Sequence, residues 1–235
     1  MSVEIYQADS SVEWLSLTQP IKLVWTDPPF GTGKKQSQRG SSYNDLTEDR
    51  AIETVVNSMR IIRPYLAHDA VVCICADYRI IHDIAVELKK FLYLQGEVIW
   101  QFGLGRPRQS WWPNRHNTII TMTTTKDQTP FDFDSIPVVK RKAPKPGYPA
   151  TKPIGSVWDK TMSNTDPERV GYPNQKPLSI VRPFIRAHTN PDDIVADPFM
   201  GSGTTGHAAT MLGRKFIGQD LNKQSIEVVN RRLNQ

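Results

Sequence analysis

The sequence Asp-Pro-Pro-Phe ends a short apolar run near the amino terminus, and its side chains could orient an aromatic amine. An exocyclic amino group on a nucleobase is a poor nucleophile, because its lone pair is delocalised into the ring. The Asp27 carboxylate and the Pro28 carbonyl can each accept one N–H hydrogen bond, which turns the lone pair toward an electrophile. Pro28 and Pro29 fix φ and offer no competing donor, and Phe30 offers a face for an extruded base. By itself the motif is equally consistent with a strand that ends in a rigid proline turn.

The residues that follow resemble the end of a phosphate-binding Walker loop, because they read Gly31-Thr32-Gly33-Lys34. A Walker loop needs a glycine five residues before Gly33 and a Ser or Thr after the lysine. Pro28 and Lys35 occupy those two positions, so the phosphate-loop interpretation fails on both counts. The segment Gly31–Lys35 is instead predicted to be a mobile basic loop beside the site.

A second motif lies near the carboxyl terminus, where an apolar strand leads into the pattern GxGxxG at Gly201–Gly206 and then into a helix. Such glycines let the backbone turn sharply and approach a ligand, whose anionic end meets the helix N-terminus. A further strand ends at Asp220, seventeen residues after Gly203, where an acid can bind ribose hydroxyls. A glycine pattern alone is often only a turn, but this order of elements indicates a nucleoside-containing cofactor.

The position of this second motif is unusual for a dinucleotide fold, in which the glycine loop follows the first strand. Only fifteen residues remain after Asp220, so the rest of the sheet must come from sequence before the glycine loop. The motif order is therefore circularly permuted. This order places Asp27–Phe30 at the carboxyl end of a strand, where open α/β sheets hold their ligands.

Short β-type runs alternate with helical periodicities along the chain, which predicts an α/β fold with a doubly wound sheet. The last two strands before the glycine-loop half have no helical pattern between them, so they are expected to pair antiparallel. The expected strands are Val3–Tyr6, Lys22–Thr26, Ala70–Cys75, Val98–Phe102, Thr118–Thr123, Asp193–Ala196 and Lys215–Gly218. The expected helices begin at the cap Thr47 (stripe Ile52, Val55, Met59, Ile62), at the cap Asp77 (stripe Ile80, Ile84, Leu88, Phe91), after Gly203 (ending near Gly213), and around Ile226, Val229 and Leu233.

Periodicity fails between residues 124 and 166, where Pro and Lys dominate, and this stretch is predicted to be an insertion rather than a core element. The expected organisation has three parts, residues 1–123, the insertion over 124–166 and residues 167–235. The family resemblance given below implies that these are a catalytic half, a target-recognition insertion and a cofactor-binding half.

The formal net charge is +5 and the isoelectric point is near 9.2, and the positive charge is concentrated in three loops without acids. Single basic runs are usually only solvated surface. Three such loops in one small domain indicate a polyanionic partner. The basic residues that we expect to bind it are Lys34, Lys35, Arg39, Arg106, Arg108, Arg115, Lys140, Arg141, Lys142 and Lys145.

Several classes of protein are disfavoured by composition. No apolar run approaches the ~20 residues of a membrane span, and no secretory signal is visible, so a cytoplasmic protein is expected. Cys73 and Cys75 alternate on one strand and are expected to point to the same face as reduced thiols. The five histidines form no metal-binding pattern, and no metal site is expected.

Together these motifs resemble the S-adenosylmethionine-dependent amino-methyltransferases of DNA, in their β-class order of catalytic motif, recognition region and cofactor motif. Asp27–Phe30 is similar to the DPPY motif of that family, with Phe in place of Tyr. Asp197–Thr204 is similar to its cofactor motif, and Asn114–Asn117 resembles the segment before its last core strand. Tyr172–Pro177 looks like its HPTQKP stretch, with Tyr and Asn in place of His and Thr. Pro183 falls inside the helix expected after this stretch, so a kink or restart is expected.

The resemblance implies S-adenosylmethionine as cofactor and direct methyl transfer to an amino nitrogen, without a covalent enzyme intermediate. It assigns orientation of the amine to Asp27 and Pro28 and stacking of the flipped base to Phe30, with Trp111 and Trp112 as second candidates. The residues expected to bind the cofactor are Asp9, Gln175, Lys176, Pro177, Asp197, Phe199, Gly201, Ser202, Gly203, Thr204 and Asp220.

The resemblance also implies double-stranded DNA as substrate, and Asp in the first position of the motif favours the N6 of adenine. N4 of cytosine is the main alternative, and an RNA amine is a third. A nicotinamide dehydrogenase would use the same glycine loop but would leave Asp27–Phe30 and the basic loops unexplained. A non-catalytic DNA-binding module would have no use for a cofactor site. A homodimer and a cognate restriction endonuclease are further partners that the resemblance leaves open.

Overall fold

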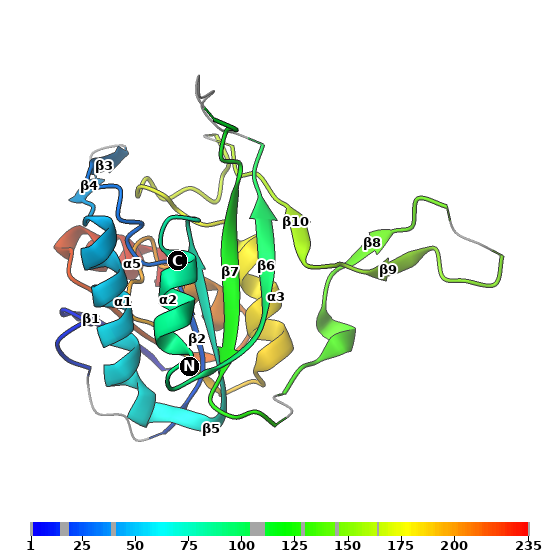
Figure 1. Ribbon diagram of the computed structural model, residues 1–235, viewed down its shortest axis with the longest axis horizontal. Coiled ribbons are helices and arrows are strands. Elements are labelled where there is room, and N and C mark those ends of the chain that lie inside the picture. Colours follow the sequence, from blue (N-terminus) through cyan, green and yellow to red (C-terminus); the bar gives the residue numbers. More distant parts are fainter. Residues whose placement is uncertain are drawn as a thin grey trace.

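An eight-stranded sheet with helices on both faces forms the centre of the protein in the computed structural model (Figure 1). The structure describes residues 2–14, 19–38, 41–103, 111–127, 130–143, 146–163 and 165–234. In spatial order the strands are β1 (Val3–Gln7), β12 (Lys215–Asp220), β11 (Ile194–Asp197), β2 (Ile21–Thr26), β5 (Leu66–Ala76), β7 (His116–Thr123), β6 (Tyr93–Gln101) and β10 (Val157–Asp159). Neighbouring strands run parallel except at β7, which is antiparallel to β5 and β6.

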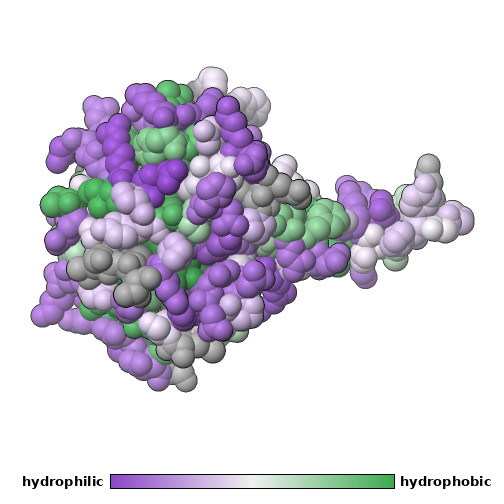
Figure 2. Space-filling view, turned by 90° about the horizontal axis from the view of Figure 1, so that it is seen from below, coloured by the Kyte–Doolittle hydropathy of each residue, from purple (hydrophilic) through white to green (hydrophobic). Residues whose placement is uncertain are grey.

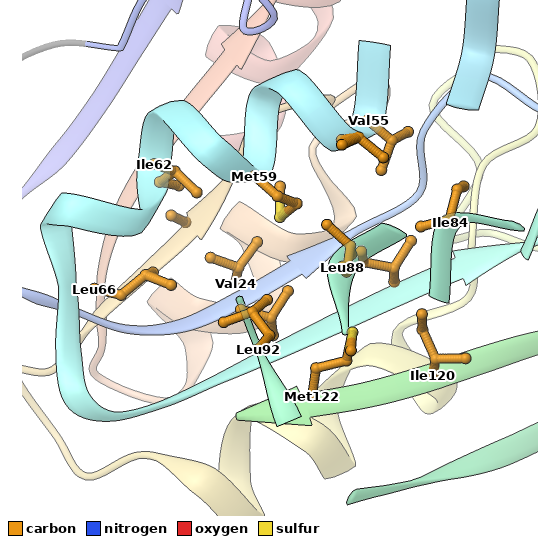
Figure 3. Close-up of a cluster of buried hydrophobic side chains, with 14 of the residues drawn as sticks. Val24, Val55, Met59, Ile62, Leu66, Ile84, Leu88, Leu92, Ile120 and Met122 are labelled. Carbon is orange, nitrogen blue, oxygen red and sulfur yellow. The ribbon is translucent and has the colours of Figure 1, made fainter. Parts of the chain in front are cut away.

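Helices α1 (Glu48–Ile62) and α2 (Ile81–Leu88) cover the face of the sheet that is toward the viewer in Figure 1. Their apolar stripes pack on side chains of the central strands, and Figure 3 shows Met59 and Leu88 close to Val24 in this core. The central strands are buried on both faces, so they are almost continuously apolar. From Leu23 onward, the residues of β2 alternate between the two cores, with Val24 in this one. Ile21 also lies in this core, because the register of β2 shifts between Ile21 and Leu23.

Helices α3 (Leu178–His188), α4 (Thr204–Met211) and α5 (Lys223–Leu233) cover the opposite face. Leu23 and Trp25 point into this second core, and so do Cys73 and Cys75, which are buried free thiols. The expected common face of the two cysteines is confirmed. The layers make a three-layer α/β/α domain, and the doubly wound fold predicted from the sequence is confirmed.

All seven strands expected from the sequence are present, with ends that differ by a few residues. The antiparallel pairing of β6 with β7 is also confirmed, with Trp100 opposite Asn117. Because β7 is the reversed strand, its first residues and the carboxyl ends of the parallel strands meet at one edge of the sheet. This carboxyl edge gathers the loops after β1, β2, β5, β6, β10, β11 and β12.

Three details of the helices differ from expectation. Asp77 does not cap α2: its Oδ1 accepts from the backbone N–H of Arg79 at 3.1 Å and from its guanidinium at 2.8 Å, and the helix begins only at Ile81. Thr47 holds the N-cap position of α1, but its hydroxyl forms no capping hydrogen bond. Pro183 lies within α3, which continues as one helix from Leu178 to His188 without a restart.

The stretch between residues 124 and 166 forms a narrow arm and one strand of the sheet. The arm carries a short 3-10 helix, Phe133–Ser135, and a hairpin of β8 (Val138–Lys140) with β9 (Thr151–Pro153). It extends sideways beyond the β10 edge of the sheet, as Figures 1 and 2 show. β10 itself, which the sequence did not reveal, pairs parallel with β6 as the last strand of the sheet.

Trp158 anchors β10 to the body of the protein, whereas its neighbour Val157 faces solvent. Trp158 is 7% exposed, its ring centroid lies 5.2 Å from that of Phe184 in α3, and its Nε1 donates to the Gly155 carbonyl at 2.6 Å. Val157 is 61% exposed.

We expect Trp158→Ala to lower the free energy of unfolding by about 3–5 kcal/mol, because it leaves a cavity between β10 and α3. Val157→Ala, one residue away on the outer face, should change it by less than about 0.5 kcal/mol. Urea denaturation of the two variants measures the difference. Equal losses would show that β10 does not pack on the sheet through Trp158.

Candidate active site at the carboxyl edge of the sheet

A cavity of about 550 Å³ lies at the carboxyl edge of the sheet, between the loops that follow β1, β2, β11 and β12. It brings together residues from both ends of the chain, as the permuted motif order predicts. The predicted residues on its wall are Asp9, Asp27, Pro28, Pro29, Lys176, Asp197, Phe199, Gly201, Ser202, Thr204 and Asp220.

The other predicted cofactor residues lie elsewhere. Gln175 and Pro177 line a neighbouring cavity, and Gly203 of the glycine loop packs against Val229 of α5. The Gln175 side chain is buried and supports its own loop, since Nε2 donates to the Glu168 carbonyl at 2.7 Å and Oε1 accepts from the backbone N–H of Val170 at 2.9 Å.

The glycine loop between β11 and α4 depends on backbone conformations that favour glycine. Gly201 has φ +47° and Gly203 has φ +73°, in the left-handed region. A Cβ on Gly203 would lie 2.8 Å from Val229, whereas a Cβ on Gly201 would lie 3.5 Å from the nearest side-chain atom, in the ring of Tyr172. Gly203 is therefore required by packing of the fold, and Gly201 by the turn that forms the cavity wall.

Asp220 fixes this loop from the end of β12. Its Oδ2 accepts from the backbone N–H of Gly201 at 2.8 Å, and its Oδ1 accepts from that of Asn222 at 2.8 Å. Burial raises the pKa of the Asp220 carboxyl, while these two N–H donors lower it. The predicted ribose-binding acid thus also holds the glycine loop in place.

Asp197 ends β11 and is buried at the base of the cavity. Its Oδ1 accepts from the Thr26 hydroxyl at 2.7 Å and from the backbone N–H of Phe199 at 3.1 Å. Its Oδ2 accepts from the Thr205 hydroxyl at 2.6 Å. Burial raises the pKa of the Asp197 carboxyl to about 7, against the lowering effect of these donors. The contacts join the end of β2, the glycine loop and the first turn of α4.

The loop after β1 completes this end of the cavity. Asp9 Oδ1 accepts from the backbone N–H of Ser11 at 2.9 Å and from its hydroxyl at 2.6 Å. The buried Ser10 hydroxyl donates to the Pro198 carbonyl at 2.7 Å. The β1 loop is therefore tied directly to the glycine loop.

A hairpin of β3 (Lys35–Gln38) and β4 (Ser41–Asn44) lies over the cavity, and no pattern in the sequence predicted it. Asn222 Nδ2 donates to the Ser42 carbonyl at 3.1 Å. The Tyr43 ring stacks on that of Tyr172, with centroids 6.5 Å apart and planes inclined by 12°. Asn174 Nδ2 donates to the Tyr43 hydroxyl at 2.9 Å. Burial raises the pKa of both phenols, so both tyrosines stay neutral hydrogen-bonding groups.

The segment Gly31–Lys35 connects Asp27–Phe30 to this hairpin, and the backbone N–H groups of Gly31 and Thr32 are already used. The Asp45 carboxylate accepts from the N–H of Gly31 at 3.3 Å and from that of Thr32 at 2.9 Å. It also accepts from the Thr32 hydroxyl at 2.5 Å. These contacts hold in place the loop that we expected to be mobile. The donors that a phosphate would need bind a carboxylate of the protein, which agrees with rejection of a phosphate loop.

The motif Asp27-Pro28-Pro29-Phe30 lies between two cavities. Asp27, Pro28 and Pro29 line the first, and Phe30 lines a second cavity of about 670 Å³. The two cavities share Lys176 on their walls, together with Pro173 and Asn174. The reactive turn and Lys176 therefore form the boundary between them.

The second cavity combines aromatic faces with buried amide and carboxyl groups. Phe30, Trp100 and Phe102 lie on its wall, and the two rings from β6 and the residue after it pack edge to face with centroids 5.5 Å apart. Asn114 Nδ2 donates to Asp77 Oδ2 at 3.0 Å on the same wall. Faces for stacking and edges for hydrogen bonding are what a flipped nucleobase requires.

The Asp27 carboxylate lies at this boundary and has two unlike oxygens. Oδ2 forms an ion pair with Lys176 Nζ. Oδ1 is shielded from solvent, and no donor in the described part of the chain makes a well-formed hydrogen bond to it. Burial raises the pKa of the Asp27 carboxyl, and the charge and hydrogen bond of Lys176 lower it. An unpaired buried acceptor is costly unless a partner arrives, so Oδ1 is suited to accept an N–H of a bound amine.

The predicted polyanion-binding residues lie on the surface in two regions. Lys34, Lys35 and Arg115 are exposed near the carboxyl edge, and Lys140 and Lys142 are exposed on the arm. Arg141 is half-buried, and its Nε donates to the Pro149 carbonyl at 3.1 Å. Trp111 and Trp112 are 72% and 80% exposed, before β7. The remaining predicted residues lie outside the described ranges: Arg39, Arg106, Arg108 and Lys145.

The described ranges hold no group of three or more His, Cys, Asp or Glu side chains that could bind a metal ion. They also hold no helix with the length and apolar character needed to cross a membrane.

The fold and the site together define a class of protein. Its members combine a permuted α/β domain with a glycine-loop cavity that lies beside an Asp-Pro-Pro-Phe turn and an aromatic pocket. Residues 21–231 match the family model described as DNA methylase, so the chain belongs to this family of S-adenosylmethionine-dependent amino-methyltransferases of DNA. The resemblance seen in the sequence is confirmed.

Known members of the family are distantly similar over nearly the whole chain. DNA adenine methyltransferase YhdJ of Escherichia coli (strain K12) is 27% identical over 229 residues, which cover 92% of this chain and 76% of that protein. The crystal structure of the M1.HpyAVI-SAM complex has a TM-score of 0.71 at 25% identity and covers 99% of this chain and 100% of the other. PvuII DNA methyltransferase (cytosine-N4-specific) has the same fold, with a TM-score of 0.71 at 19% identity over 100% of this chain and 93% of that one.

Substitution of Gly201 or Gly213 by valine should distinguish an effect on cofactor binding from an effect of backbone strain. Both have positive φ, +47° and +77°, but only Gly201 lies on the cavity wall. Valine at either position should lower the stability of the fold, because β-branched residues adopt such φ values poorly. Only Gly201→Val should weaken binding of S-adenosylmethionine, by about tenfold or more for ~1.4 kcal/mol of crowding. Calorimetric titration of the folded variants measures this, and equal affinities would show that the glycine loop does not contact the cofactor.

Proposed function

We propose that this protein transfers a methyl group from S-adenosylmethionine to the exocyclic N6 of adenine in double-stranded DNA. The observation that carries this proposal is the position of Asp27–Phe30 on the boundary between the glycine-loop cavity and the aromatic cavity. An amine held there would face the first cavity while its ring lay in the second.

The residues of the first cavity fit the cofactor. Its wall offers the acids Asp9 and Asp220 for hydroxyl and amino groups and the exposed backbone of Gly201 for close approach. Phe199 adds an apolar surface. The bound cofactor supplies a methyl group activated by a positively charged sulfur.

The protein contributes orientation and electrostatics to the transfer. Asp27 Oδ1 and the Pro28 carbonyl accept the two N–H groups of the amine, which directs the nitrogen lone pair toward the first cavity. Because the nitrogen gains positive charge as it reacts, the bond to the carboxylate strengthens in the transition state. Phe30 holds the ring of the flipped base by stacking.

Adenine is favoured over cytosine by two facts. The motif begins with Asp, which by family resemblance is more common in the adenine enzymes, and the E. coli relative is named as a DNA adenine methyltransferase. N4 of cytosine is the second candidate, because it is the same type of amine and the PvuII enzyme shares the fold. Transfer of labelled methyl to unmodified duplex DNA, followed by nucleoside analysis, tests the proposal. Label in N4-methylcytosine would show that cytosine, and not adenine, is the target base. An absence of label in DNA would reject the proposed function.

The basic surface supports DNA as the partner. Exposed Lys34, Lys35 and Arg115 border the carboxyl edge, so a duplex that delivers a flipped base to the second cavity would lie against them. The arm carries a second basic group and reaches beyond the sheet, where it could follow the duplex away from the site (Figure 1).

Substitutions at Asp27, Phe30 and Lys34 should show which half of the segment 27–34 takes part in methyl transfer. Asp27→Ala should lower the single-turnover methylation rate by on the order of 10²-fold or more, because a bond that strengthens in the transition state is lost. Phe30→Ala should weaken capture of the flipped base, by roughly 1–3 kcal/mol for the lost stacking face. Lys34→Ala should have a milder effect than either. Should Lys34→Ala abolish transfer while Asp27→Ala leaves it intact, the reactive half of the segment has been assigned wrongly.

The arm can be tested through its salt dependence. The affinity for DNA should fall with salt, with a slope of about −0.9 in log K per log salt for each phosphate that is neutralised. The triple variant Lys140→Ala, Arg141→Ala and Lys142→Ala should bind more weakly and show a flatter slope, by fluorescence anisotropy. The control changes two acids of the same arm, Asp132→Ala with Asp134→Ala, which should not flatten the slope. An unchanged slope in the triple variant would place the arm away from the DNA.

A further inference from the structure

The strongest unassigned contact at the site is the one that Lys176 makes with the reactive carboxylate. The Lys176 side chain is only 7% exposed. Its Nζ contacts Asp27 Oδ2 and donates to the Asn174 carbonyl at 3.2 Å. The ammonium also lies 4.9 Å from the ring centroid of Phe30 and 6.0 Å from that of Trp100. One buried cation therefore touches the amine-binding carboxylate and faces two rings of the base cavity.

The backbone of Lys176 is held as firmly as its side chain. The Thr204 hydroxyl, in the first turn of α4, donates to the Lys176 carbonyl at 3.0 Å. Pro177 follows directly as the N-cap of α3. The ammonium is thus positioned by elements of the cofactor half, although its partner Asp27 belongs to the other half of the permuted domain.

The two oxygens of Asp27 have different surroundings as a result. Lys176 occupies Oδ2, and Oδ1 is buried without a donor from the described residues. The Cys75 thiol faces the carboxylate and lowers its pKa, but its sulfur does not make a well-formed hydrogen bond to Oδ1. One oxygen is anchored, and the other is left for a ligand.

We propose that Lys176 is a positioning residue for methyl transfer, which fixes the Asp27 carboxylate through Oδ2 and keeps it ionised so that Oδ1 can accept the target amine. This inference rests on the proposed function. The family resemblance had implied that Lys176 binds the cofactor. The present inference assigns its side chain to the positioning of the amine instead. The carboxylate then lies between the ammonium and the nitrogen that becomes positive, so the lysine does not oppose the developing charge.

The charges around Asp27 fix the sign of the expected effect. The groups that face it are Lys176, Cys75 of β5, Asp197 of β11, and Asp45 and Tyr43 of the hairpin region. Lys176 is the positive charge among them. Burial already raises the pKa of Asp27, and removal of Lys176 raises it further. In the variant, Asp27 would therefore become protonated at a higher pH than in the parent. The acid limb of the pH–rate profile would move to higher pH.

The matched control lies at the other end of the same strand. Lys22 of β2 pairs with Asp69 at 2.5 Å and its side chain is 16% exposed, so it is also a largely buried lysine in an ion pair. Its position at the amino end of β2 keeps it away from the carboxyl edge. Lys22→Met therefore measures the effect of removing a largely buried lysine–aspartate ion pair while the contact between Lys176 and Asp27 is kept.

The test is the pH profile of single-turnover methylation at saturating cofactor and DNA. For Lys176→Met we expect the acid limb to move up by about one pH unit or more, and the affinity for S-adenosylmethionine to stay within about threefold of the parent. Lys176→Arg keeps the charge and should return the limb toward the parent value, and Lys22→Met should not move it. A Lys176→Met variant that loses cofactor affinity and keeps the parental limb would overturn the inference.

A second measurement does not depend on methyl transfer. Carbon-13 NMR of labelled aspartate carboxyls, with Asp27→Asn to assign the signal, follows the titration of Asp27 directly. A rise of its pKa in Lys176→Met supports the inference even if the parent protein methylates no DNA, in which case only the proposed function fails. An unchanged Asp27 titration overturns the inference whatever the activity. If Lys176→Met does not fold, Lys176→Gln keeps a donor without the charge and is judged by the same two outcomes.

Discussion

The buried carboxyl group of Asp197 is the contact on which the rest of the site depends. It binds the hydroxyl of Thr26, the residue before the reactive turn, and the hydroxyl of Thr205, in the first turn after the glycine loop. These partners lie far apart along the chain, and in the permuted order of motifs no short connection brings them together. Because a buried carboxyl is costly without hydrogen bonds, the two loops are held in one arrangement. The distance between the glycine-loop cavity and the Asp27–Phe30 turn is therefore set by the core of the protein.

The site divides its work between two adjoining cavities. Polar loops and the glycine turn form the first, and aromatic rings with paired amide and carboxyl groups form the second. Asp27 and Lys176 form the boundary, and each comes from a different half of the domain. Such a division suits a reaction between two bound molecules, because each is oriented by its own walls and the reacting atoms meet at the boundary. The stacked Tyr43 and Tyr172 cover the first cavity from the hairpin side.

Sequence patterns gave the framework of the fold, and the exceptions have clear physical causes. The central strands β2, β5 and β11 could be recognised because buried parallel strands are continuously apolar and are bounded by turn residues. β10 was missed because it is three residues long, and its one buried side chain, Trp158, is recognised only by its contact with α3. The Asp77 cap was wrong because this carboxylate bonds with Arg79 and Asn114 instead of the first turn of α2. Pro183 did not break α3, whose apolar side packs into the core around it.

The sequence by itself determined the family, the permuted order of the motifs and the place of the reactive turn at the end of a strand. These features depend on neighbours along the chain: alternation in strands, the 3.6-residue period of helices, and glycines where φ is positive. Only the tertiary structure decided which oxygen of Asp27 is free, that Lys176 holds the other, and that Tyr43 covers the cavity. Asp27 and Lys176 are 149 residues apart. A pair so distant is created by sheet order and loop packing, which no local pattern encodes.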